Sequence, residues 1–186
     1  MEKQQRNKLI QHQQRAFNEG TVEYINDQWV FFDDETEEAT LLNIWIREEI
    51  EVFHFNRWRK GRLKNDGMIQ LRRDEYHLKD QDLIRIRKRL VFSLEQLLTE
   101  VNDEAFCQFI ITLNSMNFSI YDCIYCYNHL TFLSESMQKN GVNFIIFDNG
   151  DNICTVQHHF VYYENKSDRF EFTLNTGKRM VIEKIG

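Results

Sequence analysis

The chain has 186 residues, 42% of them hydrophobic and 13% aromatic, and a formal net charge of −6. These apolar side chains are sufficient for a packed core, which excludes disorder over most of the chain. The length fits one large domain or two small ones. No segment approaches the roughly 18 apolar residues that span a bilayer, and the amino-terminal residues lead into no apolar run. The four cysteines are too few for a secreted disulfide scaffold, so we expect a cytoplasmic protein that contacts no membrane.

Residues 1–15 are rich in glutamine and carry a net positive charge. They predict a short polar helix or arm. Three apolar side chains would dock this segment on the rest of the protein, namely Leu9, Ile10 and Phe17.

Residues 16–55 contain eleven acidic residues and one basic residue, whereas residues 56–89 contain twelve basic and five acidic residues. This charge boundary coincides with an internal repeat, in which each copy has an aromatic residue three positions before a glycine, Gly20 or Gly61. In both copies two strand-like segments are joined by a tight turn within about 35 residues, which is typical of an SH3-like small barrel. We therefore predict an acidic barrel over residues 16–55 and a basic barrel over residues 56–89.

Two interpretations of this inverted charge are open. The two barrels could pack on each other through complementary charge. Alternatively, the basic barrel could bind RNA or single-stranded DNA, because such proteins combine a cationic groove with aromatic rings on which bases stack. The candidate binding residues are then Arg57, Trp58, Arg59, Lys60, Arg62, Arg72, Arg73 and Tyr76.

Residues 90–186 change to a helical period and predict an α+β domain. Helices are expected to begin near Ser93 and Asp103, and a third is expected over residues 119–141, with Ser119 as its N-cap. Glycine-containing turns then separate four strands at residues 142–147, 153–163, 170–174 and 180–182. The predicted fold class is α+β, in which tandem SH3-like barrels precede a helical block packed on a four-stranded antiparallel meander.

Cys123 and Cys126 form a CxxC pair. A zinc site needs four ligands and usually a second close pair, and the chain has no second CxxC. On the predicted helix both thiols share one apolar arc with Tyr127, Leu130, Leu133 and Met137. Buried core cysteines are therefore the preferred interpretation, without metal or cofactor. A redox pair, or a metal site completed by His158 or His159, is the alternative.

The consecutive residues His158 and His159 lie on a predicted strand, so their rings point to opposite faces and do not easily serve one metal or proton relay. His158 shares its face with mostly apolar residues, which favours a structural role. The alternative is a small-ligand or catalytic pocket formed by Asp122, His158, His159 and Tyr162.

The sequence lacks a phosphate-binding loop, a dinucleotide-binding glycine pattern, a nucleophile elbow and an HExxH motif, which lowers the expectation of an enzyme. Four stretches stand out: GTVEYIN at residues 20–26, LKDQDLIRIR at 78–87, NFSIYDCIYCYNH at 117–129 and QHHF at 157–160. They resemble an uncharacterised family of soluble proteins from Bacillus and its relatives. The resemblance spans nearly the whole chain and implies a bacterial cytosolic protein, and the family has no assigned activity.

The leading hypothesis is a non-catalytic interaction or adaptor protein. Its tandem barrels would bind a protein partner, and its carboxy-terminal domain would be a second docking surface or the dimerisation unit of a homodimer. Two alternatives come from other classes: nucleic-acid binding by the basic barrel, and a small-ligand or enzyme domain in the carboxy-terminal half.

Overall fold

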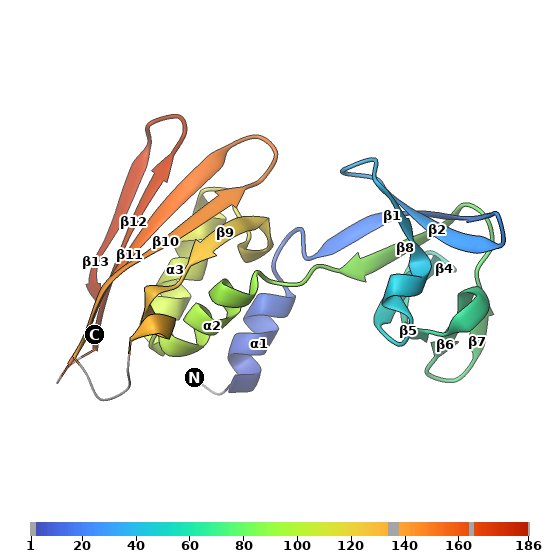
Figure 1. Cartoon of the computed structure of the whole chain (residues 1–186), viewed down its shortest axis with the longest axis horizontal. Helices are drawn as coiled ribbons and strands as arrows, with labels where there is room; N and C mark the ends of the chain where they lie inside the picture. The colour runs from blue at the N-terminus through green and yellow to red at the C-terminus, as the bar shows by residue number, and fades with distance from the viewer. Residues whose placement is uncertain (1–2, 134–137, 164–165, 186) are drawn as a thin grey trace. The chain divides into compact units, whose positions relative to one another are not determined.

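The computed structural model describes residues 3–133, 138–163 and 166–185 (Figure 1). The chain divides into two compact units, of which one is Ala16–Lys88 and the other combines Met1–Arg15 with Arg89–Gly186. We call the first the all-β unit and the second the α+β unit. Among the described residues, no helix is long and apolar enough to cross a bilayer.

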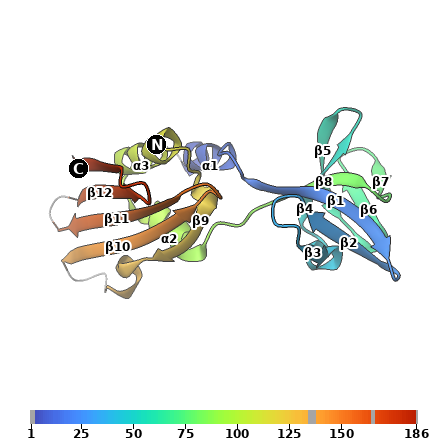
Figure 2. The ribbon, with the colours of Figure 1, turned by 90° about the horizontal axis from the view of Figure 1, so that it is seen from above.

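The all-β unit is one antiparallel sheet of eight strands, ordered β3-β2-β1-β8-β4-β5-β6-β7 (Figures 1 and 2). Two-residue turns join β1 to β2 and β4 to β5, and both residues of each turn have positive φ, as a type I′ turn requires. Two short 3-10 helices, η1 (Leu42–Trp45) and η2 (Asn65–Gly67), complete the unit. The strands are β1 (Phe17–Ile25), β2 (Gln28–Asp33), β3 (Ala39–Leu41), β4 (Glu49–His54), β5 (Arg57–Leu63), β6 (Met68–Leu71), β7 (Glu75–His77) and β8 (Asp82–Arg87).

The two separate barrels expected from the repeat are not found. Strand β8, which the sequence assigned to the second barrel, pairs with β1 on one side and with β4 on the other, and both of these belong to the first copy. The described residues therefore contain one continuous sheet and no closed barrel. The repeat predicts the hairpins, because turn and strand signals are local, but it does not specify which edges join.

The repeated glycines have a packing role. A Cβ on Gly20 would lie 1.9 Å from the backbone oxygen of Phe32, and a Cβ on Gly61 would lie 2.5 Å from a side-chain carbon of Ile69. Each glycine thus permits a close approach between neighbouring strands. The core inside this sheet is mostly aliphatic and includes the fully buried Val52. Its other members are Val22, Phe31, Leu42, Ile50, Leu63, Ile69, Leu71, Leu78, Ile84 and Ile86.

The α+β unit contains three helices and a five-stranded antiparallel sheet, ordered β13-β12-β11-β10-β9. Phe109 of the third helix lies 5.2 Å from Phe170 and 6.2 Å from Phe147 between ring centres, so this helix packs on the sheet. The helices are α1 (Lys3–Gln11), α2 (Phe92–Glu100) and α3 (Asp103–Ser115). The strands are β9 (Cys123–Tyr127), β10 (Lys139–Asp148), β11 (Ile153–Tyr162), β12 (Lys166–Leu174) and β13 (Arg179–Ile185).

Four of these strands, β10 to β13, are those that the sequence predicts, and β9 is additional. The helix predicted over residues 119–141 is wrong: this stretch contains η3 (Ile120–Asp122), β9, η4 (His129–Phe132) and the start of β10. Ser119 and Asp122 do form the expected capping box, but it closes only η3. Met137 lies outside the described residues.

The caps of α2 and α3 also differ from expectation. Helix α2 begins one residue before Ser93, whose hydroxyl donates to the carbonyl oxygen of Cys126 at 2.6 Å. Helix α3 is capped by Asn102, whose side-chain oxygen accepts from the backbone N–H of Ala105 at 2.8 Å. Ser93 therefore ties α2 to β9.

Helix α1 docks mainly through a charged residue. The guanidinium of Arg6 donates to the carbonyl oxygens of Leu98 and Val101 at 2.8 and 3.0 Å, and it lies 4.8 Å from the ring centre of Phe106. Among the three expected apolar contacts, Ile10 packs against the core of the α+β unit. Leu9 is 40% exposed, and Phe17 belongs to β1 of the all-β unit.

Candidate functional site

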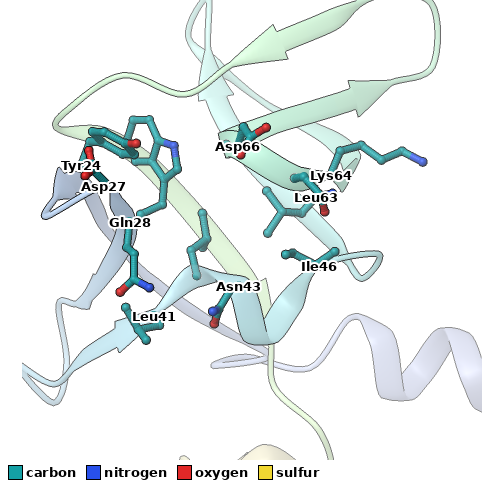
Figure 3. A pocket seen from close by; sticks show the side chains of 13 residues that line it. Tyr24, Asp27, Gln28, Leu41, Asn43, Ile46, Leu63, Lys64 and Asp66 are labelled. Carbon is teal, nitrogen blue, oxygen red and sulfur yellow. The ribbon is translucent and has the colours of Figure 1, made fainter.

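A cavity of about 550 Å³ opens in the all-β unit between the β1–β2 turn, η1 and η2 (Figure 3). Its apolar lining includes Tyr24, Trp29 and Leu63. The rings of Tyr24 and Trp29 are 5.2 Å apart between centres and form one wall. We call this cavity the aromatic groove. Its volume lies within the roughly 300–1,000 Å³ that small-molecule and side-chain pockets usually have.

Local backbone geometry shapes the aromatic groove. Gly67 ends η2 with φ of +71°, and a Cβ at this position would lie 2.2 Å from Nε1 of Trp29. The indole therefore rests directly on the backbone of Gly67. Asp27 and Asp66 also have positive φ, 62° and 58°, which aspartate and asparagine tolerate better than most residues.

The aromatic groove carries an unbalanced negative charge at its rim. Asp27 and Asp66 line it and are exposed, and neither has an ion-pair partner among the described residues. Lys64 also lines the cavity, but Figure 3 shows its ammonium group extending away from it. A cavity lined by two carboxylates together with a tyrosine and a tryptophan suits an organic cation.

A second, smaller cavity of about 270 Å³ lies along β5 and the turn between β6 and β7. Six of the eight nucleic-acid-binding candidates line it, and we call it the basic groove. Arg62 and Tyr76 are the two candidates that do not. The lining residues are Arg57, Trp58, Arg59, Lys60, Leu71, Arg72, Arg73 and Asp74.

Part of the positive charge in the basic groove is neutralised internally. Arg59 donates to both carboxylate oxygens of Asp74, at 2.7 and 2.8 Å, and this interaction lowers the pKa of that carboxyl. Lys60 pairs with Glu49 at 2.7 Å. Three further arginines, Arg57, Arg72 and Arg73, are exposed and have no ion-pair partner within the described part of the chain.

On the outer face of the sheet the acidic and basic segments do pair. Arg85 lies opposite Glu19 on one side and Glu51 on the other, and its guanidinium is 2.6 Å from a Glu51 oxygen. The same guanidinium stacks at 4.2 Å on the ring of Phe17 and at 4.4 Å on that of Trp58. Complementary charge therefore acts between strands of one sheet.

In the α+β unit the residues of the predicted pocket do not converge as a set. His158 and Tyr162 both reach Asp168: Nε2 of His158 is 2.7 Å, and the hydroxyl of Tyr162 is 2.5 Å, from Oδ1. Asp122 instead pairs with Arg15 at 2.6 Å, and His159 points to the other face, 3.4 Å from Glu171.

The cluster around Asp168 is closed to solvent. The side chains of His158 and Asp168 are fully buried, and the ring of His158 stacks on Phe170 at 4.4 Å between ring centres. Nδ1 of His158 lies 3.0 Å from the side-chain amide of Asn143. Burial, followed by the hydrogen bond to Asp168, raises the pKa of Tyr162. The arrangement matches the structural role preferred for His158, because each polar atom already has a partner and no substrate can reach the imidazole.

Both thiols of the CxxC pair are buried in the core of the α+β unit, whereas Ile124, Tyr125 and Tyr127 beside them in β9 are exposed, so Tyr127 does not share the buried face predicted for it. Burial raises the pKa of Cys123 to about 12 and that of Cys126 to about 11. Within the described residues, no group of three or more histidine, cysteine or acidic side chains has the geometry to hold a metal ion. Core packing is thus the role that the structure supports for these cysteines.

Comparison with known proteins identifies the family. The family described as "Protein of unknown function (DUF2777)" matches residues 4–184. The chain belongs to this family. One relative, the "Uncharacterized protein YisN" of Bacillus subtilis (strain 168), is 28% identical over 178 residues, which cover 95% of this chain and 90% of the relative. No solved structure matches the chain.

Family membership confirms the resemblance seen in the sequence. It carries no activity and no functional residue to this chain. A functional hypothesis therefore depends on the two grooves of the all-β unit. The sequence patterns indicated one of them and missed the aromatic groove, because its lining comes from three segments without a shared motif.

Proposed function

We propose that this protein is a non-catalytic interaction protein, and that its all-β unit binds a basic segment of a partner protein in the aromatic groove. One observation carries the proposal: the Tyr24–Trp29 wall and the carboxylates of Asp27 and Asp66 line one cavity, and neither carboxylate forms an ion pair among the described residues. A lysine or arginine side chain of the partner would lie over the rings, with its charge between Asp27 and Asp66.

A peptide segment suits this groove better than a free amine. Leu41 and Ile44 are 40% and 62% exposed at and beside the cavity, and a single small cation would leave them in water. A segment with apolar residues flanking its basic side chain would cover them as well. The buried cluster around Asp168 favours a role other than catalysis for the α+β unit, since its imidazole has no access to solvent.

The test uses a blocked pentapeptide with one central arginine, a leucine on each side of it and glycine at both ends, titrated into the ¹⁵N-labelled protein. The chain has three tryptophans, and their indole N–H resonances are assigned by single Trp→Phe replacements. We expect the Trp29 resonance to shift with the arginine peptide and not with the matching glutamate peptide. Equal shifts with both peptides, or no shift, would overturn the proposal.

The variant that tests the charge is Asp27→Asn combined with Asp66→Asn. Asparagine tolerates positive φ at both positions, so the turns are retained. We expect affinity for the arginine peptide to fall by about threefold to tenfold, because exposed ion pairs contribute little each. Asp34→Asn, which removes an exposed carboxylate outside the groove, is the control and should leave affinity unchanged.

A further inference from the structure

The hairpin between β4 and β5 presents an aromatic ring in an unfavourable backbone conformation. Phe55 occupies the first position of its turn with φ of +53°, and its side chain is 78% exposed. Left-handed φ is disfavoured for bulky residues, whereas asparagine, glycine and aspartate are common in such turns. Because the exposed ring contributes little to the core, packing does not explain why a phenylalanine stands here.

Phe55 is the outermost member of a row of rings. Its ring centre lies 4.0 Å from that of His54, and the His54 ring lies 4.8 Å from that of Tyr76. Nδ1 of His54 has no hydrogen-bond partner in the described structure. The row is therefore held by ring contacts rather than by polar anchoring of the imidazole.

The basic groove begins next to this row. Arg57, which lines the groove, lies directly opposite His54 in the hairpin, and Asp74, at the other rim, is two residues from Tyr76. Five cationic residues and one acidic residue line the groove, and the arginines at 57, 72 and 73 have no ion pair among the described residues. An exposed phenylalanine thus stands two residues from Arg57, an unpaired arginine that lines the basic groove.

Strand β5 also leaves part of its backbone edge open at this point. Its residues from Gly61 onward pair with β6, whereas residues 57–60 pair only with β4. The open edge gives an extended chain room to lie between β5 and the turn that carries Arg72 and Arg73.

We propose that the basic groove and the aromatic row form a binding site for single-stranded nucleic acid. Phosphates would contact Arg57, Arg72 and Arg73, and a base would stack on Phe55. Stacking is tolerant of base identity, because every base has a π-face, so no sequence preference is expected. This site shares no lining residue with the aromatic groove, and it does not depend on the function proposed there.

The binding test is fluorescence anisotropy of the full-length protein with labelled oligo(dT) and oligo(U) of about ten nucleotides, a length within the usual site size. If each of the three arginines releases one counterion by contacting a phosphate, the slope of log affinity against log salt concentration is about −2. Affinity should then fall about 20-fold between about 50 and about 200 mM salt. The oligo(dT) and oligo(U) titrations distinguish DNA from RNA, and binding of either supports the proposal.

Phe55→Asn tests stacking without weakening the fold, because asparagine suits the left-handed turn better than phenylalanine does. We expect this variant to bind about 5-fold to 150-fold more weakly, the range found when a stacking ring is removed. Arg72→Ala with Arg73→Ala should reduce the salt slope by about 1.4. Phe92→Ala removes a ring that is 70% exposed in the other unit, and Lys79→Ala removes an exposed cation outside the groove; both should bind normally.

Two outcomes would overturn the proposal. One is a flat titration with both oligonucleotides at the lower salt concentration, or binding that Phe55→Asn and the double arginine variant leave unchanged. The other is full competition by an oligoglutamate peptide of equal charge at equal concentration, which would show that the groove binds acidic protein segments without selecting bases.

Discussion

The buried carboxylate of Asp168 offers the sharpest test of the α+β unit, through the replacement Asp168→Asn. Three side chains donate hydrogen bonds to this carboxylate. His158 and Tyr162 donate to Oδ1, and the side-chain amide of Asn102 donates to Oδ2, 3.1 Å away. If the new asparagine keeps its oxygen toward His158 and Tyr162, its NH₂ group faces the NH₂ group of Asn102. Two donors then lie against each other without an acceptor. Asn102 cannot rotate its amide without losing the cap of α3, in which its oxygen accepts from Ala105.

The expected cost follows from these contacts. A buried donor left without an acceptor costs about 1–3 kcal/mol, and hydrogen bonds to a charged group lose part of their strength when the acceptor becomes neutral. We expect the free energy of unfolding of the α+β unit to fall by about 3 kcal/mol, which at a urea m-value of about 2 kcal/mol/M lowers its unfolding midpoint by about 1.5 M. The matched control Asp151→Asn, an exposed carboxylate on the β10–β11 turn, should change stability by less than about 0.5 kcal/mol.

Two optical signals allow the measurement to be assigned. All three tryptophans, Trp29, Trp45 and Trp58, lie in the all-β unit, so tryptophan fluorescence reports on that unit. Far-UV circular dichroism includes α1, α2 and α3 of the α+β unit. The predicted loss appears as an earlier helical transition in urea. A helical midpoint for Asp168→Asn that coincides with that of Asp151→Asn would refute the account of the cluster.

Three further predictions concern thiols, pH and the aromatic groove. At about pH 8 the folded protein should react with an aromatic disulfide reagent at most at the half-buried Cys107, and at all four cysteines after denaturation, because buried thiols stay protonated and inaccessible; rapid labelling of Cys123 and Cys126 would favour a redox pair instead. Burial raises the pKa of Cys123, Cys126 and Cys154 from 9.0 to about 12, 11 and 11, so the folded state retains their protons; the contribution of these thiols to the free energy of unfolding should be constant below pH 9 and fall as the pH rises toward 12, which urea midpoints above pH 9 measure. Gly67→Ala, which combines a positive φ with a Cβ against an indole, should destabilise the all-β unit by more than about 1 kcal/mol in tryptophan-monitored unfolding.

The elements that the sequence predicts correctly are those specified by neighbouring residues. Strands β10 to β12 alternate buried side chains with more exposed ones over most of their length, and an Asn-Gly turn follows the first of them. Helices α2 and α3 carry a continuous apolar face. The position of β8 between β1 and β4 depends on pairing between distant segments, for which the sequence contains no local signal.

Strand β9 shows how a local signal can mislead. Cys123 and Cys126 are three residues apart and both buried, which is a helical spacing rather than the alternation of a regular strand. The register between β9 and β10 shifts at Phe147, so a bulge brings both thiols to the core side. A single-residue irregularity of this kind cannot be recognised from apolar spacing alone.

The candidate sites divide in the same way. The sequence supplies candidate residues for the basic groove because its cationic residues come from one short stretch of chain, β5 to the β6–β7 turn. The aromatic groove draws Tyr24, Leu41 and Leu63 from separate segments, and Phe55 is conspicuous only once its backbone conformation is known.

The charge pattern gives the two grooves a common physical origin. In the sequence, acids and bases form opposing blocks, and in the sheet part of this charge is paired between neighbouring strands, as in the contacts of Arg85 with Glu51 and of Lys60 with Glu49. At positions where a charged side chain forms no ion pair, an uncharged polar residue would support folding equally well. Among the charges that form no such ion pair in the described structure, two acids line the aromatic groove and three arginines line the basic groove. Unneutralised charge that gathers beside exposed rings raises the self-energy of the folded state, and a ligand of opposite charge lowers it.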